Sequence, residues 1–382
     1  MDAVFVKNRL ALLLDHFGDV PDPREPAKVR FPLREVLFLV VCATVAGCDD
    51  YDEIALWGEV NLAFLRGYSE YFFGAPGEDW LRALLNRIDP RLFEACFTRW
   101  ALSLRPDAAD LIALDGKSLR RSGDSAAAQK PLHLVSAWAS SQRLVLAQEP
   151  IDAKENECAA ILAILQRLTI KGALVTIDAI ATNPEIAKAI TDAGGDYLLA
   201  LKSNQPTLQA EVEAYFAETP PGEIETVQVV DKDHGRIETR TTSVSRNVRW
   251  LLAADDRRYP GHPRFPTLKT LVRTVTRTEH RGKVTDQTRY FFSSAALTAE
   301  RAAEAVRAHW GVESLHWVLD VVFREDLSRL RRGHGAQNMA LVRRFAFNIV
   351  RHGRGKRSIK TARKAAGWSP GLLAALVTPP AR

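Results

Sequence analysis

Three acidic side chains in this sequence stand in settings that suit metal-ion chemistry. Asp115 follows the apolar run Leu111–Leu114, and Asp178 follows the apolar run Leu174–Ile177. Both runs are typical of buried strands, and α/β sheets build their sites at the carboxyl ends of strands. Glu313 lies in an expected helix among apolar and aromatic neighbours. Each residue alone is more typical of a turn, a cap or a solvated face, but their shared settings favour one functional site.

Carboxylates of this kind are suitable ligands for hard cations. Mg²⁺ prefers carboxylate oxygens and keeps coordination positions open for a substrate phosphate. Two such ions about 3.5–4 Å apart activate an attacking hydroxyl and stabilise the leaving oxygen of an in-line displacement. The predicted chemistry is therefore metal-dependent phosphoryl transfer.

Positive charge is concentrated near the C-terminus. The chain has 382 residues and a net charge of +6, yet the stretch from Arg324 to Lys364 holds 13 Lys and Arg residues against Glu325 and Asp326. That stretch carries a net charge of +11, which leaves the rest of the chain near −5. On charge alone, a polyanion-binding surface and a solvated basic face are equally favoured. The predicted chemistry adds weight to nucleic acid as the partner.

Composition excludes several other classes of protein. Apolar residues make up 46% and charged residues 26%, which is the balance of a globular protein with a substantial core. The four cysteines form no CxxC pair, so neither a zinc site nor a disulfide framework is indicated, and we expect a reducing cytoplasm. The longest apolar run, from Val36 to Gly47, is too short to span a bilayer, and no signal peptide is recognisable. We expect no membrane partner.

The first hundred residues show helical periodicity. Breaks at Asp49-Asp50 and Asp89-Pro90 separate successive apolar faces. The predicted helices cover Leu10–Phe17, Val36–Ala46, Ile54–Leu65, Glu78–Arg87 and Pro90–Leu104. We expect a helical N-terminal domain over residues 1–105.

From Asp110 onward, short buried-strand patterns alternate with helical ones. The predicted strands are Leu111–Leu114, Leu132–Ala139, Arg143–Glu149, Ala173–Ile177 and Tyr197–Leu201, and the predicted helices are Glu157–Leu168, one from Asn183-Pro184 to Ala193, and Thr207–Phe216. This order indicates a mixed sheet with helices packed on it.

Residues 220–295 differ from this pattern and predict a β-rich insertion. Its expected strands are Val227–Val230, Ile237–Val244, Thr270–Thr278 and Thr288–Ser293. A long helix over Ala299–Val322 follows and carries Glu313. In the next amphipathic helix, Ala340–Val350, Arg343 and Arg344 are expected on the solvent side.

Several motifs resemble the DDE transposases of bacterial insertion sequences, and most closely their H-repeat-associated group. The resemblance covers roughly residues 15–370, and the motifs occur in the family's order. They are Ile112-Ala113-Leu114-Asp115-Gly116-Lys117-Ser118-Leu119-Arg120, Leu132-His133-Leu134-Val135-Ser136-Ala137, Val175-Thr176-Ile177-Asp178-Ala179, His309-Trp310-Gly311-Val312-Glu313, FPLREVLFLVVCATVAGCDDYDEI near the N-terminus, LKSNQPTL at 201–208, and LHWVLDVVFREDLSR at 315–329.

The resemblance implies an α/β fold: a ribonuclease-H-like mixed sheet with flanking helices, a β-rich insertion and a helical N-terminal domain that binds DNA. The catalytic domain would span residues 106–350, and a basic C-terminal segment residues 351–382. Asp115, Asp178 and Glu313 fall on the family's catalytic triad, which holds two Mg²⁺ ions, with Mn²⁺ as a substitute.

The implied reaction is cleavage at transposon ends, followed by joining of the freed 3′-hydroxyl to target DNA without a covalent protein–DNA intermediate. The implied partners are double-stranded DNA, as terminal inverted repeats and target, and a second copy of the chain in a homodimeric synaptic complex. The implied location is the bacterial cytoplasm, in association with the nucleoid.

The sequence departs from the family pattern at one point. The family commonly has one more residue, Asn, between the glutamate and Ser-Leu-His-Trp, whereas Ser314 follows Glu313 directly here. One missing residue rotates the rest of a helix by about 100°. As the sequence stands, Glu313, His316, Trp317 and Asp320 share one helix face. The deletion is either absorbed locally by the helix or mis-aims the site. We expect a local helical bulge to absorb it, and Asp320 is the competing third acid.

Other polar residues are candidates for DNA contacts, each with a structural alternative. Lys117 and Arg120 follow the first catalytic aspartate and are equally typical of a generic surface. Lys202, Asn204 and Gln205 form a polar loop after a strand, where contacts to the DNA backbone are favoured. Arg343, Arg344 and Arg351 belong to the basic stretch. Trp310 is more typical of core packing than of base stacking.

Two other functional classes remain open from the sequence. One is a catalytically impaired or repurposed DNA-binding protein derived from such a transposase. The other is a nuclease with the same core that does not join strands. Metal-dependent cleavage of a terminal-repeat substrate separates the first from an active enzyme, and strand-transfer products exclude the second.

Overall fold

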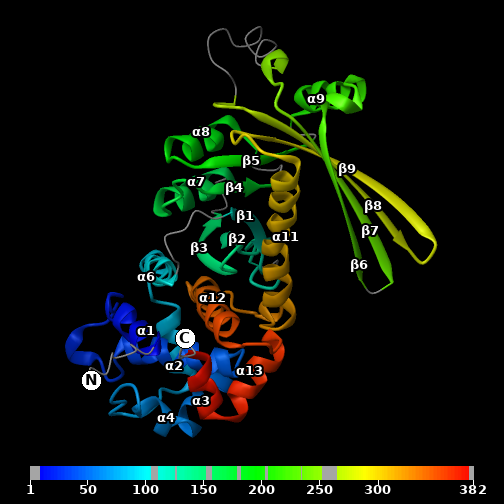
Figure 1. Cartoon of the computed structure of the whole chain (residues 1–382). Coiled ribbons are helices and arrows are strands. Elements are labelled where there is room, and N and C mark those ends of the chain that lie inside the picture. The colour runs from blue at the N-terminus through cyan, green and yellow to red at the C-terminus, as the bar shows by residue number, and fades with distance from the viewer. Residues whose placement is uncertain are drawn as a thin grey trace, which may run out of the picture.

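One continuous nine-stranded sheet runs through the protein, with helices on both faces (Figure 1). A computed structural model describes residues 9–104, 111–124, 127–151, 157–178, 182–202, 205–233, 235–251 and 265–377. The strands follow the order β3-β2-β1-β4-β5-β9-β8-β7-β6. Their bounds are β1 Leu111–Ser118, β2 His133–Ala139, β3 Leu144–Ile151, β4 Leu174–Ile177, β5 Asp196–Leu201, β6 Glu225–Asp233, β7 Arg236–Ser245, β8 Thr270–His280 and β9 Lys283–Ser293.

The first five strands form a ribonuclease-H-like sheet. β1 pairs in parallel with β4, and β4 pairs in parallel with β5. β2 is antiparallel to both β1 and β3, as the predicted hairpin requires. The predicted fold class is therefore confirmed, including the mixed strand directions.

The register of this sheet places two candidate acids beside each other. Leu114 of β1 is paired with Ile177 of β4, so Asp115 and Asp178 follow at the same level. β1 does not end at Asp115, as the sequence predicted, but continues to Ser118. The extra residues pair with β2, which the apolar pattern of β1 alone does not reveal.

Alternation along β1 assigns its residues to opposite faces. Ile112 and Leu114 pack in the core under α7 (Glu157–Arg167) and α8 (Pro184–Asp192). Leu111 and Ala113 pack in the core shared with α11 (Ala299–Val321). Because side chains alternate, Asp115 belongs to the α11 face and Gly116 to the α7 face. The same parity in β4 puts Asp178 on the α11 face.

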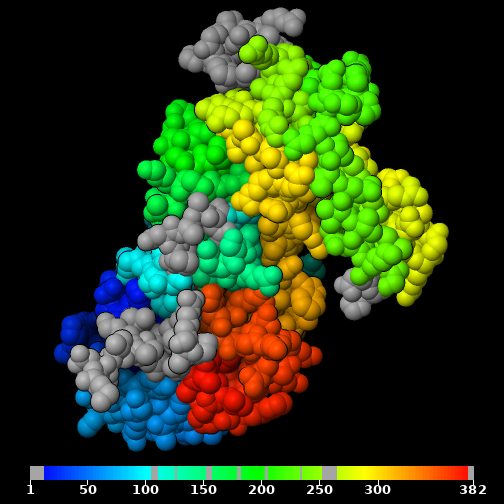
Figure 2. Space-filling view, viewed as in Figure 1, coloured from blue at the N-terminus to red at the C-terminus, as the bar shows by residue number. Residues whose placement is uncertain are grey.

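The insertion lengthens the sheet instead of forming a separate unit. β9 pairs antiparallel with β5, and β8, β7 and β6 follow outward. Figure 2 shows these strands standing out from one side of the molecule, away from the helical body. Helix α9 (Pro206–Glu218) precedes the insertion. The strands are longer than predicted because their exposed outer halves lack apolar alternation.

The N- and C-terminal helices form a single helical body at the other end (Figure 1). Helix α2 is buried on all sides and contacts α1, α12 and α13. The bounds are α1 Arg9–Gly18, α2 Leu33–Ala46, α3 Tyr51–Val60, α4 Leu62–Arg66, α5 Glu78–Leu85, α6 Pro90–Ser103, α12 Gly335–Gly353, α13 Ile359–Trp368 and α14 Pro370–Val377. The single helix predicted over Ile54–Leu65 is two helices, because the Asn61 side chain caps the Trp57 carbonyl between them.

The prediction for the solvent side of α12 is wrong. Arg343 is 2% exposed and Arg344 is fully buried. The Arg344 guanidinium pairs with Glu325, which is also buried. An arginine stripe on a helix looks the same in sequence whether it faces water or a buried carboxylate, so periodicity alone misassigned it.

Helix α11 is regular over its whole length. It begins at the cap Thr298, whose side chain accepts a hydrogen bond from the Arg301 N–H, and continues without a π-turn to Val321. The predicted bulge after Glu313 is therefore absent. The helix is an ordinary α-helix despite the missing residue. The regular repeat of about 3.6 residues per turn therefore decides which residues after Glu313 share its face.

Candidate active site

The three candidate acids line one cavity of about 380 Å³ between the sheet and α11. Asp115 comes from β1, Asp178 follows β4, and Glu313 comes from α11. The wall also includes Lys202, Gln209, Arg289, His309 and Trp310. The sheet register and the α11 contact thus converge the acids from three distant parts of the chain.

Asp115 is the most enclosed of the three acids. Its side chain is about 25% exposed. Burial, together with the charges of three neighbouring carboxylates, raises its pKa to about 7. These neighbours are Glu157, Asp178 and Glu313. Accumulated negative charge at a buried carboxylate is an arrangement that a cation relieves.

Asp178 carries an internal counterion in this structure. Lys202 Nζ lies 2.9 Å from its Oδ1 and 3.2 Å from its Oδ2. Both side chains are about half exposed, so this pair lies at the mouth of the cavity. The lysine is therefore placed to neutralise Asp178, or to meet a phosphate when another cation does so.

Glu313 is the third acid that faces the cavity, and Asp320 is not. Glu313 is exposed on α11 and lines the cavity wall. Asp320, two turns further on, lies with its Oδ1 2.6 Å from Lys117 Nζ. The geometry therefore gives the competing aspartate a different partner.

Two histidines of α11 also lie close to the acids. Thr176 Oγ1 is 2.9 Å from His309 Nδ1, and His316 Nδ1 is 3.5 Å from Asp115 Oδ2. Burial lowers the pKa of His309 to about 4 and that of His316 to about 3. Both rings are neutral near pH 7 and add no positive charge to the cavity.

A fourth carboxylate near the site, that of Glu157, was not predicted from the sequence. It is the first residue of α7, and its charge contributes to the raised pKa of Asp115. An added Cβ at Gly116 would lie 2.4 Å from Glu157 Oε1. In sequence it is an ordinary acidic residue at a helix start, so only the packing of α7 on the sheet reveals its position.

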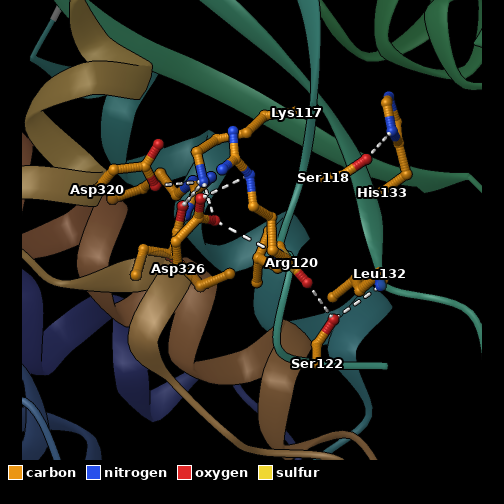
Figure 3. Close-up of polar contacts among 12 residues, drawn as sticks. Lys117, Ser118, Arg120, Ser122, Leu132, His133, Asp320 and Asp326 are labelled. Carbon is orange, nitrogen blue, oxygen red and sulfur yellow. Dashed lines mark hydrogen bonds and ion pairs between the residues drawn. The ribbon is translucent and has the colours of Figure 1, made fainter. Parts of the chain in front are cut away.

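Lys117 is buried and paired with carboxylates, so the expectation that it contacts DNA is wrong (Figure 3). Its Nζ lies 3.3 Å from Glu325 Oε2 and 3.2 Å from Asp326 Oδ1, besides its pair with Asp320. Burial by itself raises the pKa of Glu325, but the charges of Arg344 and Lys117 lower it to about 2. This buried ion cluster ties β1 to the end of α11.

The remaining predicted DNA contacts fall in different places. Arg120 is exposed, with its Nε 3.3 Å from Asp326 Oδ2 (Figure 3). Asn204 lies outside the described residues. Gln205 precedes α9, and Gln209, one turn later, is the glutamine that lines the cavity.

Arg351 lines a second cavity, of about 450 Å³, behind α11. Arg143 and Arg307 line the same cavity. Burial, and then the charges of Arg354 and Arg143, lower the pKa of Arg351 to about 10. Within the described ranges, the three arginines that line this cavity, and Arg354 beside them, have no carboxylate within ion-pair distance. The cavity is therefore open to an anion.

Trp310 separates these two cavities. It lines both, and the guanidinium carbons of Arg289 and Arg307 lie 5.5 and 5.3 Å from its ring centroid. Its side chain is partly exposed, so the expectation of simple core packing is wrong. The sequence missed Arg289 because it belongs to the outer insertion.

The donor chemistry of the cavity fits a divalent cation. Three carboxylates face it, and carboxylate oxygens are the ligands that Mg²⁺ prefers. In the side-chain positions of the described residues, no three His, Cys, Asp or Glu groups already form a metal-binding cluster. Asp115, Asp178 and Glu313 are the residues that would hold the ion.

Sequence comparison assigns the family. Residues 106–349 match the family model described as "Transposase DDE domain", and residues 14–101 match the one described as "DDE_Tnp_1-associated". The chain therefore belongs to the DDE transposases, a class of DNA-acting enzymes that generally use divalent metal ions such as Mg²⁺. Within that class it belongs to the H-repeat-associated group, so the resemblance predicted from the motifs is confirmed.

Individual relatives agree with this assignment. An Escherichia coli (strain K12) protein named "H repeat-associated putative transposase YhhI" is 35% identical over 89% of this chain and 90% of its own length. A Xanthobacter autotrophicus protein described as "Uncharacterized protein in dhlA 3'region" is 39% identical over 73% of this chain and 92% of its own.

Among solved structures, the cryo-EM structure of the piggyBac transposase synaptic complex with hairpin DNA matches 99% of this chain and 81% of its own. The identity is 12% and the TM-score 0.45, values too low to bear on the function of this chain. Across the described part of the chain, no helix is long and apolar enough to cross a membrane.

Proposed function

We propose that this protein is a DNA transposase that cleaves the ends of its own element and joins the freed 3′-hydroxyl to target DNA. One observation carries the proposal: Asp115, Asp178 and Glu313 converge on a single cavity from three elements of a ribonuclease-H-like fold. The same three positions match the family's catalytic motifs.

The three carboxylates would hold two Mg²⁺ ions, for which Mn²⁺ would substitute. When bound, the ions would activate the attacking hydroxyl and stabilise the charge on the phosphoryl group that is transferred. Asp115 and Asp178 act from neighbouring strands, and Glu313 closes the site from the opposite wall. The neutral ring of His309, fixed by Thr176, fills space beside them without competing for the ions.

Basic side chains around the two cavities position the DNA. Lys202, at the cavity mouth beside Asp178, would contact a backbone phosphate when a cation is bound to Asp178. Arg143 and Arg351 line the second cavity and receive phosphates on the other side of α11. Trp310, between the two cavities, presents a partly exposed ring to an unstacked base.

The assembly around this chemistry follows the same reasoning. The N-terminal helical domain over residues 1–105 and the basic segment over residues 351–382 contact double-stranded DNA outside the cavity. Two element ends must be held together during transposition, so the working form is at least a homodimer. Its substrate places it at the bacterial nucleoid.

Cleavage of a terminal-repeat duplex tests the catalytic assignment. Asp115→Asn, Asp178→Asn and Glu313→Gln should each lower Mg²⁺-dependent cleavage by at least about 100-fold, since even groups that only support a metal ligand cost about 10–100-fold. Binding of the uncleaved end should change by no more than a few-fold. Asp79→Asn and Glu304→Gln, both exposed and away from the cavity, are the matched controls.

The outcomes separate the alternative functions. Wild-type protein that binds ends but never cleaves them is the impaired DNA-binding protein. Cleavage without strand-transfer products on a supercoiled target identifies a simple nuclease. Cleavage that survives Glu313→Gln but is lost in Asp320→Asn would remove Glu313 from the triad.

A further inference from the structure

Glu157 approaches the candidate active site from the face of the sheet opposite to Glu313. It lies at the start of α7, whereas α11 covers the other face. Its carboxylate packs against the backbone of Gly116, the residue next to Asp115. Burial raises the pKa of Glu157, the charge of His133 lowers it, and the charge of Asp178 raises it. The glutamate is therefore electrostatically coupled to both aspartates.

Gly116 provides the space through which Glu157 reaches the site. Residue 116 belongs to the α7 face, where any other residue would project its side chain. A Cβ there would lie 2.4 Å from Glu157 Oε1 and 2.5 Å from His133 Nε2. Real Cβ atoms do not approach other atoms so closely, so the glycine and the two side chains are mutually fitted.

His133 lies on the same side of Gly116 as Glu157. Ser118 Oγ lies 2.8 Å from His133 Nδ1, which fixes the ring on β2 (Figure 3). With the serine hydroxyl donating to Nδ1, the ring N–H is on Nε2 and faces the Glu157 side of Gly116. His133 Nε2 is buried and has no hydrogen-bond partner among the described residues. It lies beside the Glu157 carboxylate without a hydrogen bond or a close ion pair to it.

We infer that Glu157 is a fourth acidic residue of the cation site, a positioning residue that adds negative charge beside Asp115. The inference rests on the proposed metal-dependent function. Glu157 strengthens the attraction for divalent cations from the α7 side, while Asp115, Asp178 and Glu313 line the cavity itself. Like-charge crowding in the ion-free protein is the cost of that arrangement, and a bound cation removes it.

A merely structural role for Glu157 makes a different prediction. An acidic residue in the first turn of a helix stabilises it through the helix dipole, whether or not a metal is present. Glu185 holds the equivalent place in the first turn of α8, but it is exposed. Glu185→Gln is therefore the matched control for the dipole contribution alone.

Thermal unfolding of the full chain, with and without MgCl₂, distinguishes the two roles. Without Mg²⁺, Glu157→Gln should melt at a higher temperature than wild type, because one of four crowded carboxylates has lost its charge. With Mg²⁺, the variant should gain less stability, since the stabilisation at a given ligand concentration grows with the logarithm of the affinity. The Mg²⁺ concentration needed for a given rise in melting temperature should increase about tenfold.

One control and two contrary outcomes complete the test. Glu185→Gln should leave the Mg²⁺ response of the wild type unchanged. A Glu157→Gln variant that melts lower than wild type, with an unchanged Mg²⁺ response, overturns the role of Glu157 alone. A wild-type protein that shows no response to Mg²⁺ or Mn²⁺ overturns the proposed metal site and this inference with it.

Discussion

Neighbouring residues 115, 116 and 117 of β1 illustrate how three adjacent positions serve three purposes. Asp115 turns toward the cavity under α11, Gly116 leaves room on the α7 face, and Lys117 turns back toward α11 into a buried ion cluster. Strand alternation dictates these directions. A change of residue type at 116 should therefore disturb its neighbours on both faces.

Gly116→Ala tests this close packing. The added methyl group would overlap Glu157 and His133, so we expect overpacking to cost about 1–3 kcal/mol of unfolding free energy. Cleavage should fall by about 10–100-fold as the supporting side chains are displaced. Urea unfolding and end cleavage measure the two effects. Gly222→Ala, where no atom lies within 4 Å of the new Cβ, should be close to neutral. Equal stability and cleavage in both variants would contradict the packing at Gly116.

Helix α11 is the element that brings the site together. Along one face it presents Glu313 to the cavity, His316 to Asp115 and Asp320 to Lys117. These positions are spaced at i, i+3 and i+7, so a regular helix aligns them. The buried cluster around Lys117 then anchors the end of the helix to β1. The helix without the extra family residue therefore makes a consistent set of contacts.

Insertion of Asn between Glu313 and Ser314 should therefore be harmful. It rotates the downstream residues by about 100° relative to Glu313. Asp320 would leave Lys117, which removes one of the three carboxylate partners of that buried ammonium group. We expect lower thermal stability and less cleavage in Mg²⁺. The same insertion after Gly282, in the exposed turn between β8 and β9, is the control. An insertion at Glu313 that raised cleavage would show that the short segment is a defect.

The elements themselves were largely predictable from sequence, whereas their mutual packing was not. Apolar runs located β4 and β5, and Asn183-Pro184 marked the start of α8, where the Asn183 side chain caps two backbone N–H groups. The burial of Arg344 depends on Glu325, which lies in another element. The position of Glu157 likewise depends on how α7 meets β1. Such pairings are set by tertiary packing, which leaves no local pattern in the sequence.

At the scale of the whole molecule, part of the positive charge that the sequence concentrates near the C-terminus is buried and does not reach the surface. Of the 13 basic residues between Arg324 and Lys364, Arg343, Arg344 and Arg363 are buried. Arg363 is bound to Asp49 and to the carbonyls of Thr44 and Val322, which joins α13 to the N-terminal helices. The surface available to DNA is therefore smaller than the net charge of +11 indicates. Exposed cations remain at the start of α13 and in the turn before it.

The last prediction concerns this exposed group, Lys356, Arg357 and Lys360. Replacing all three by Ala should flatten the salt dependence of DNA binding, because each lost phosphate contact lowers the log–log slope by about 0.9. Unfolding temperature should hardly change, since none of the three packs in the core. Lys188→Ala, an exposed lysine already paired with Asp192, should leave the slope unaltered. Fluorescence anisotropy of a terminal-repeat duplex at several salt concentrations gives the slope. If the triple variant keeps the wild-type slope, the DNA does not pass over the start of α13, and the phosphate contacts come from basic residues elsewhere, such as Lys202 and the arginines of the second cavity.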